Sequence, residues 1–350
     1  MKIRHKPRIP VAPPPKKPTL LMNIGVGWSA TTPFLYTLSI DQRYCHPGHI
    51  KENHYLRMIF EQDCCNKFDI HKFILSTSAN EKQWIFRKWQ KELFEYSYHF
   101  LDDPNYIKDW YSLPVTIDKY IDYYIKHWEV IKSDFHAVAD FSNHNWAIPY
   151  YENGSDMIKE IQKEFELKVT VQFRDPIKRL YSELGTCFVD KRVPHMFTLG
   201  ATSKLLRGRK YLQNNQHNNF FKFCLDDGAW DSANCRYIDL LTKWESLVGT
   251  ANILPIIMEE FWNPQYRKQQ CERLSNFLGA PIQKIHQNAY FPDMGADAPH
   301  HIGLIDQWTS DKETITEETI EYALKYMKPC YTDWKSKFGS VPELWTKYED

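Results

Sequence analysis

Apolar residues along this chain fall into short continuous runs and into longer runs with helical spacing. The continuous runs predict buried strands at residues 19–26, 135–141, 167–173 and 252–258. The helical patterns lie at residues 31–39, 81–101, 115–132, 155–165, 177–184, 237–247, 264–278 and 314–327. Because strands and helices alternate, we expect an α/β fold of three layers, with a central parallel sheet covered on both faces.

The flanking segments set the expected domain organisation. Residues 1–18 are basic and rich in proline, which predicts a flexible arm, and residues 19–345 are predicted to form a single domain. Residues 188–232 are rich in Asn and Gly and are predicted to be a less regular, variable insertion. The insertion contains the basic segment at residues 207–210, which fits an anionic substrate or, at least as well, a solvated loop.

Small and polar residues gather where predicted strands end. Gly27, Asp140 and Arg174 each lie at or just after a strand end, and ligands of parallel sheets bind at that edge. The segment GVGWSATT at residues 25–32 joins the first strand to a helix start, an arrangement that can bind a phosphate through backbone N–H groups. A structural turn of small residues explains this segment equally well.

Charge and composition exclude several classes of function. The 350 residues include 44 Lys and Arg and 44 Asp and Glu, and this neutral balance disfavours a general nucleic-acid binder. No apolar run is long enough for a membrane span, and the N-terminus lacks the apolar stretch of a signal peptide, so we expect a cytoplasmic protein. The eight cysteines lack metal-site spacing, and the pair His300–His301 has no third ligand nearby, so no metal is predicted.

Two segments resemble the nucleotide-binding motifs of sulfotransferases. Residues 25–32 are similar to the family's 5′-phosphosulfate loop, and FRDPIKRLYS at residues 173–182 is similar to its 3′-phosphate motif. The resemblance implies a P-loop sulfotransferase fold, the donor 3′-phosphoadenosine 5′-phosphosulfate (PAPS), the product adenosine 3′,5′-bisphosphate and no metal. The cofactor-binding residues that it implies are Gly27, Trp28, Ser29, Ala30, Thr31, Thr32, Arg174 and Ser182.

The chemistry of Arg174 and Ser182 fits a phosphate. A guanidinium offers a planar fork to a dianion, and Ser182, two helical turns further on, can donate its hydroxyl to the same group. The alternative is a strand-end arginine that forms a surface ion pair.

The segment Lys51-Glu52-Asn53-His54-Tyr55 resembles a segment of glycan-type sulfotransferases. There the glutamate takes the proton of the acceptor hydroxyl. The resemblance therefore implies that Glu52 is the general base, with His54 and Lys51 beside it, and that the acceptor is a hydroxyl of a carbohydrate or another small molecule. The alternative for Glu52 is a solvated surface glutamate.

The main departure from the family is Trp28, which stands where a Lys or Arg usually neutralises charge on the leaving oxygen. Losing one such group costs about 2.7–4 kcal/mol of barrier. Three interpretations remain open: a slow enzyme, an enzyme with a relocated cation, or a nucleotide-binding protein without turnover. A nucleotide kinase is disfavoured because Thr31 occupies the place of the P-loop lysine.

Overall fold

The computed structural model describes the sheet, helices that cover it and several isolated positions. The described residues are 17–26, 29, 34, 38, 44–45, 55–60, 114–132, 136–190, 211, 216–228, 230–231, 235–280, 282 and 314–346.

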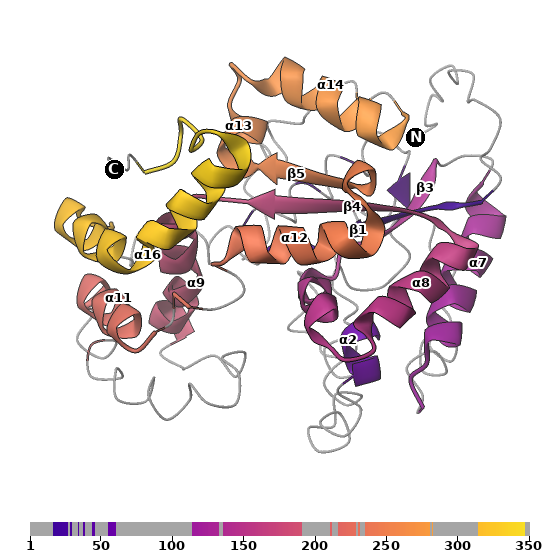
Figure 1. The fold of residues 1–350 in the computed structure, drawn as a ribbon, viewed down its shortest axis with the longest axis horizontal. Helices are drawn as coiled ribbons and strands as arrows, with labels where there is room; N and C mark the ends of the chain where they lie inside the picture. Colours follow the sequence, from indigo (N-terminus) through magenta and orange to yellow (C-terminus); the bar gives the residue numbers. More distant parts are fainter. Residues whose placement is uncertain are drawn as a thin grey trace, which may run out of the picture.

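A parallel five-stranded sheet forms the centre of the molecule (Figure 1). Its strands are β1 (Thr19–Asn23), β2 (Tyr44–Cys45), β3 (Ala137–Asp140), β4 (Glu166–Phe173) and β5 (Ile253–Ile257). They lie in the order β2-β3-β1-β4-β5, and every neighbouring pair is parallel. The predicted α/β class is therefore confirmed, and the four predicted strands are β1, β3, β4 and β5.

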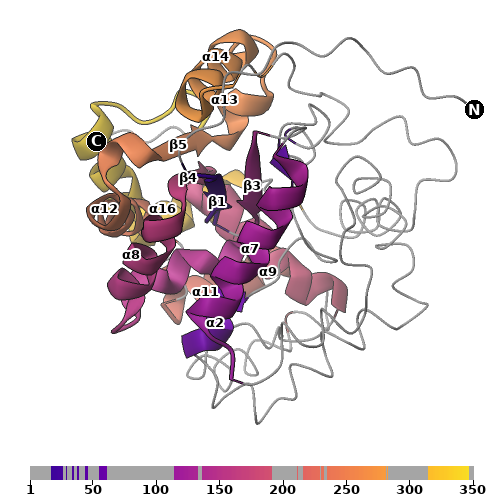
Figure 2. The ribbon, with the colours of Figure 1, turned by 90° about the vertical axis from the view of Figure 1, so that its right-hand side faces the viewer.

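Helices cover both faces of the sheet (Figures 1 and 2). On one side lie α13 (Met258–Trp262) and α14 (Arg267–Leu278), and on the other lie α7 (Ile117–Ile131), α8 (Gly154–Glu164) and α12 (Tyr237–Val248). The remaining helical elements are α2 (Tyr55–Phe60), η2 (Asn143–Tyr150), α9 (Pro176–Asp190), α11 (His217–Asp226), η3 (Thr250–Asn252) and α16 (Glu317–Phe338).

The alternation of side chains along the strands divides the core into two clusters. Leu20 and Met22 belong to the larger cluster, whereas Leu21 between them belongs to the smaller one, and all three side chains are fully buried. Successive strand residues point to opposite faces, so a strand buried on both sides reads as a continuous apolar run. This is why β1 is visible in the sequence.

The C-terminal helix is longer than its sequence pattern predicts. The expected helix ends at residue 327, but α16 continues through Pro329 to Phe338 and stops before Gly339, whose φ is 84°. A helix-interior proline costs about 3 kcal/mol. Burying Tyr331 and Trp334 beyond it returns about 1.5–3 kcal/mol for each side chain, which outweighs that cost.

The predicted irregular insertion at residues 188–232 contains a regular element. Residues 217–226 form α11, and its Phe220, Phe221, Cys224 and Leu225 are completely buried in the larger core cluster. The asparagines of this segment hid an apolar face with helical spacing. The prediction of irregular structure is therefore wrong for these residues.

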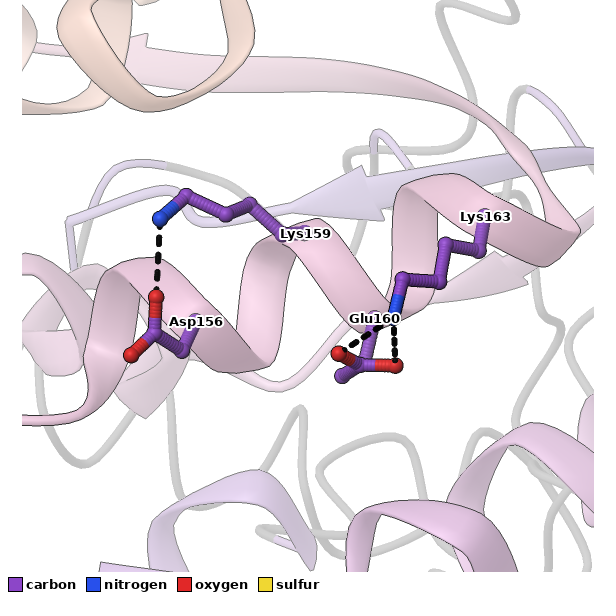
Figure 3. A network of polar contacts seen from close by, with 4 residues as sticks. All are labelled: Asp156, Lys159, Glu160 and Lys163. Atoms are coloured by element: carbon purple, nitrogen blue, oxygen red, sulfur yellow. Dashed lines mark hydrogen bonds and ion pairs between the residues drawn. The ribbon is translucent and has the colours of Figure 1, made fainter.

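The outer face of α8 is a solvated helix surface (Figure 3). Lys159 Nζ lies 2.8 Å from Asp156 Oδ1, and Lys163 Nζ lies 2.6 Å from Glu160 Oε1. All four side chains are exposed, and ion pairs of this kind contribute little to stability because water solvates the charges equally well.

Candidate nucleotide site

The connections that follow β1 and β4 run in opposite directions. After β1 the chain crosses to β2 beyond β3, whereas after β4 it crosses to β5 at the other edge of the sheet. In open α/β sheets such a reversal leaves a crevice at the carboxyl ends of the two strands, where ligands bind. The two segments that resemble nucleotide motifs follow exactly these strands.

Strand β4 extends further than β1 along their common direction. Asn23, the last residue of β1, pairs with Thr170, and β4 continues to Phe173 before Arg174. At about 3.3 Å per residue, Arg174 lies about 13 Å further along the strand direction than this pair. The loop after β1 and the corner after β4 are thus separate regions of one edge, as two phosphate groups of one nucleotide require.

A buried amide holds the start of the loop. Asn23 Oδ1 accepts a hydrogen bond of 3.1 Å from the Gly25 N–H, and Asn23 Nδ2 donates to Thr170 and Gln172 on β4. The Ile24 N–H also donates to the Thr170 carbonyl over 2.9 Å. These bonds tie the first turn of the loop to the neighbouring strand.

Ser29 is the predicted loop residue whose side chain the structure describes. It is fully buried, and within the described part of the chain its hydroxyl has no hydrogen-bond partner. A buried hydroxyl without a partner is costly, so such a group calls for an explanation, and a bound anion provides one. The other predicted loop residues, Gly27, Trp28, Ala30, Thr31 and Thr32, lie outside the described residues, and their roles stay predictions.

The structure brings Arg174 and Ser182 together at the carboxyl end of β4. Arg174 Nη1 donates to Ser182 Oγ over 3.1 Å, and both residues are partly exposed. The strand delivers the arginine to the edge, and α9 carries the serine two turns along on the face that looks back at it. A cation and a hydroxyl at hydrogen-bond distance, open to solvent, form a donor pair that suits a phosphate dianion.

The backbone on both sides of Arg174 is fixed by one buried and one partly buried side chain. The Tyr237 hydroxyl donates to the Arg174 carbonyl over 2.8 Å, and the Asp175 N–H donates to Glu259 Oε1 over 3.1 Å. Burial raises the pKa of the Glu259 carboxyl, while the hydrogen bond from the Asp175 N–H acts in the opposite direction. Tyr237 lies on the core face of α12, where Leu241 and Trp244 are also buried.

Asp175 organises the corner and was missed as a key residue by sequence reasoning. Its fully buried carboxylate accepts hydrogen bonds from Lys178 N at 3.0 Å, Tyr331 Oη at 3.1 Å and Thr346 N. Trp345 beside it donates to Glu259 over 3.1 Å. The local signal was present, because an Asp before a Pro at a helix start is a favoured N-cap arrangement, but the distant tyrosine and C-terminal partners are invisible in the sequence.

The end of β3 carries a second buried carboxylate, Asp140. It accepts hydrogen bonds from Tyr120 Oη at 2.8 Å, Asn145 Nδ2 at 3.1 Å and the Ser142 N–H at 2.9 Å. Burial and the nearby Asp140 raise the pKa of Tyr120. These donors anchor the strand end, which favours a structural role for Asp140.

Phe141, the residue after β3, is fully buried with its ring 6.0 Å from that of Phe34. Position 141 therefore places an aromatic ring in the core. The predicted catalytic residues Lys51, Glu52 and His54 lie outside the described residues. Tyr55, the next residue in the chain, is buried with its ring 5.9 Å from Tyr120, the partner of Asp140.

The described part of the chain contains neither a metal site nor a membrane-spanning helix. Within it, no three His, Cys, Asp or Glu side chains gather as a metal site requires, and His300–His301 lie elsewhere. None of its helices combines the length and apolar character needed to cross a membrane. Cys224, Cys235, Cys271 and Cys330 are buried free thiols.

Comparison with known proteins finds similarity among solved structures only. No family model and no curated protein matches the chain. A sulfotransferase from Alicyclobacillus acidocaldarius is 14% identical with a TM-score of 0.49, over 96% of this chain and 99% of that one. The sulfotransferase domain of the Synechococcus PCC 7002 olefin synthase is 13% identical with a TM-score of 0.35, over 92% and 98%. A sulfotransferase from Mycobacterium avium is 11% identical with a TM-score of 0.38, over 94% and 79%.

Proposed function

We propose that this protein binds PAPS at the carboxyl ends of β1 and β4 and transfers its sulfuryl group to an acceptor hydroxyl. The observation that carries the proposal is the 3.1 Å contact between Arg174 Nη1 and Ser182 Oγ. These two side chains come from the segment that resembles the 3′-phosphate motif, and they meet beside the switch point of the sheet.

The surroundings of Arg174 support a phosphate-binding role. Its carbonyl is held by the buried Tyr237 and the next N–H by the partly buried Glu259, so the guanidinium extends from a fixed backbone. A site that is organised before the ligand arrives loses less conformational entropy on binding. Ser182 Oγ already accepts a hydrogen bond from Arg174. Both side chains can therefore donate to the same phosphate without a large movement.

The loop after β1 is proposed to bind the 5′ side of the donor. The Asn23–Gly25 hydrogen bond fixes its start, and the buried Ser29 hydroxyl is a donor that has no partner in the structure. Residues 27–32 then supply backbone N–H groups and the hydroxyls of Thr31 and Thr32.

The bound PAPS supplies the sulfuryl group and leaves as adenosine 3′,5′-bisphosphate. Glu52 is proposed to accept the proton of the acceptor hydroxyl, whose oxygen forms the new bond to sulfur as the bond to the phosphate oxygen breaks. His54 and Lys51 are proposed to position Glu52 and balance charge. The acceptor is proposed to be a carbohydrate hydroxyl because residues 51–55 resemble the glycan-type segment.

A second candidate is a protein that binds the nucleotide without turnover, and Trp28 favours it. An indole carries one N–H donor and no charge, so it cannot neutralise the leaving oxygen as Lys or Arg does. Replacing Trp28→Lys should then create or raise sulfuryl transfer. An inactive protein that stays inactive with this lysine would contradict the second candidate.

Calorimetric titration of adenosine 3′,5′-bisphosphate without magnesium tests the donor site. We expect saturable binding that weakens by about 1.5–3 kcal/mol in Arg174→Ala, the usual contribution of hydrogen bonds to a charged group. Lys159→Ala is the matched control, because it removes one positive charge from the exposed face of α8. Absence of binding by the wild type, or equal losses in both variants, would contradict the proposal.

A further inference from the structure

A second buried donor without a partner lies on β4, outside the motifs that resemble nucleotide-binding segments. The side chain of Gln172 is 2% exposed, and its Nε2 has no hydrogen-bond partner among the residues that the structure describes. A buried donor that has lost water without gaining an acceptor is unfavourable by about 1–3 kcal/mol. In native proteins such groups mark a site where water, an ion or a ligand supplies the acceptor.

The orientation of the Gln172 amide follows from the backbone. The Gly25 N–H can only donate, so its partner atom on Asn23 must be the oxygen. The other end of the Asn23 amide is then the nitrogen, which donates to Thr170 Oγ1 at 3.0 Å and to Gln172 Oε1 at 2.8 Å. Gln172 must therefore present its oxygen to Asn23 and its NH2 group away from it. Exchanging O and N in either amide would break this chain of bonds.

The position of Gln172 places that NH2 group between the two proposed phosphate regions. Gln172 is hydrogen-bonded to Asn23, which holds the start of the loop, and it precedes Arg174 by two residues. At about 3.3 Å per residue, the two backbone positions lie within about 7 Å of each other. On the opposite face, Val171 and Phe173 pack into the larger core cluster.

We propose that Gln172 is a further donor-binding residue, whose Nε2 donates to an anionic oxygen at the 5′ side of the bound nucleotide. The proposal rests on the proposed function and extends it to a residue that the motif pattern does not contain. Together with the Ser29 hydroxyl, Gln172 gives the crevice two buried donors, both without a partner in the structure. Neutral donors in a water-poor site bind an anion while leaving the buried face uncharged when the site is empty.

The test is a calorimetric titration of three probes into the full chain: adenosine 3′,5′-bisphosphate, adenosine 5′-phosphate and adenosine 3′-phosphate. Gln172→Met keeps the length of the side chain and removes the donor. We expect this variant to bind the two probes that carry a 5′-phosphate at least about tenfold more weakly, as for a hydrogen bond to a charged group. Binding of adenosine 3′-phosphate should not change.

Thr170→Val is the matched control, because it removes the other acceptor of Asn23 Nδ2 without touching the Gln172 amide. Because Thr170 also helps to hold the loop start, any loss of affinity in this variant should be smaller than the loss in Gln172→Met. Should Gln172→Met fail to fold, as judged by its thermal transition, Gln172→Glu replaces it. Glutamate keeps the acceptor for Asn23, removes the donor and adds a charge that repels a 5′-phosphate, so its loss should be larger.

Three results would overturn the inference. Unchanged binding of all probes by the Gln172 variant would mean that water alone satisfies Nε2. A loss of affinity in the Gln172 variant that is the same for all three probes would mean that the amide acts only through packing. A loss in Thr170→Val as large as that in the Gln172 variant would mean the same. Failure of the wild type to bind any probe would overturn the proposed function first, and the inference with it, which distinguishes that outcome from the other two.

Discussion

The exposed face of α8 and the corner after β4 both carry charged side chains, but they hold them in different ways. On α8 the pairs Asp156–Lys159 and Glu160–Lys163 lie in solvent, three residues apart on one helix (Figure 3). At the corner, Asp175 is fully buried, and its partners come from α9, α16 and the segment after it. The solvated charges have water as an alternative partner, whereas the buried carboxylate has only the protein.

This difference indicates that buried charges, rather than exposed ones, position the residues of a site. A buried carboxylate needs a full set of donors, and collecting them brings distant segments to one point. At this corner the result is a rigid backbone on either side of Arg174. The exposed pairs of α8 connect residues that the helix already holds together, so they fix nothing further.

The largest expected effect is on stability, from Asp175→Ala. The change removes the N-cap of α9 and leaves the Tyr331 hydroxyl and the Thr346 N–H without their acceptor. One cap contributes about 1 kcal/mol and each of the two donors that lose their acceptor costs about 1–3 kcal/mol, so we expect a loss of about 3–7 kcal/mol. Urea unfolding measures it, and a loss below about 1 kcal/mol would contradict the central role of Asp175.

The next effect concerns the buried pair Arg179–Glu183 on α9, with Nη1 and Oε2 2.7 Å apart. Although burial acts to lower the pKa of Arg179, the neighbouring Glu183 holds that pKa above its ordinary value. Arg179→Met leaves the carboxylate without its cation, and we expect a loss of about 3 kcal/mol. The double variant Arg179→Met with Glu183→Leu should recover most of that loss. Thermal unfolding of both variants checks this, and an equally unstable double variant would refute it.

A smaller effect is expected for Tyr237→Phe, which removes the hydroxyl that donates to the Arg174 carbonyl. One hydrogen bond contributes about 0.5–1.5 kcal/mol to stability. If this bond also positions Arg174, affinity for adenosine 3′,5′-bisphosphate should fall as well. Tyr150→Phe is the control, because Tyr150 donates to Asp239 on the exposed surface. Equal nucleotide affinity in both variants and the wild type would limit Tyr237 to a structural role.

The smallest effect is expected on α8. Lys159→Ala and Lys163→Ala each remove an exposed ion pair, and both stability and nucleotide affinity should match the wild type within error. Thermal unfolding and calorimetry measure the two quantities. A large loss in either variant would erase the contrast between the two regions.

The sequence predicted the sheet well because its strands are buried on both faces and therefore read as apolar runs. It also predicted that Arg174 and Ser182 would lie close together, since a strand end and a helix face define both positions. It missed α11, whose first turn carries Asn218 and Asn219, and the last turns of α16, which lie beyond Pro329. In both, tertiary burial outweighed local preference.

The network around the site was beyond prediction for a physical reason. Tyr331 and Thr346 are far from Asp175 in the sequence, and a tyrosine that packs in a core looks the same whether or not its hydroxyl reaches a carboxylate. The partners of Gln172 are equally hidden, because a lone glutamine within a strand carries no signal of its own. Only the fold shows which polar groups are buried together and which of them has no acceptor.

The most direct test of the central claim compares adenosine 3′,5′-bisphosphate with adenosine 5′-phosphate by calorimetry, in the wild type and in Arg174→Ala. We expect the wild type to bind the bisphosphate at least about tenfold more tightly than adenosine 5′-phosphate, and we expect Arg174→Ala to lose this preference. A wild type that binds both nucleotides equally, or a variant that keeps the full preference, would show that Arg174 does not bind the 3′-phosphate.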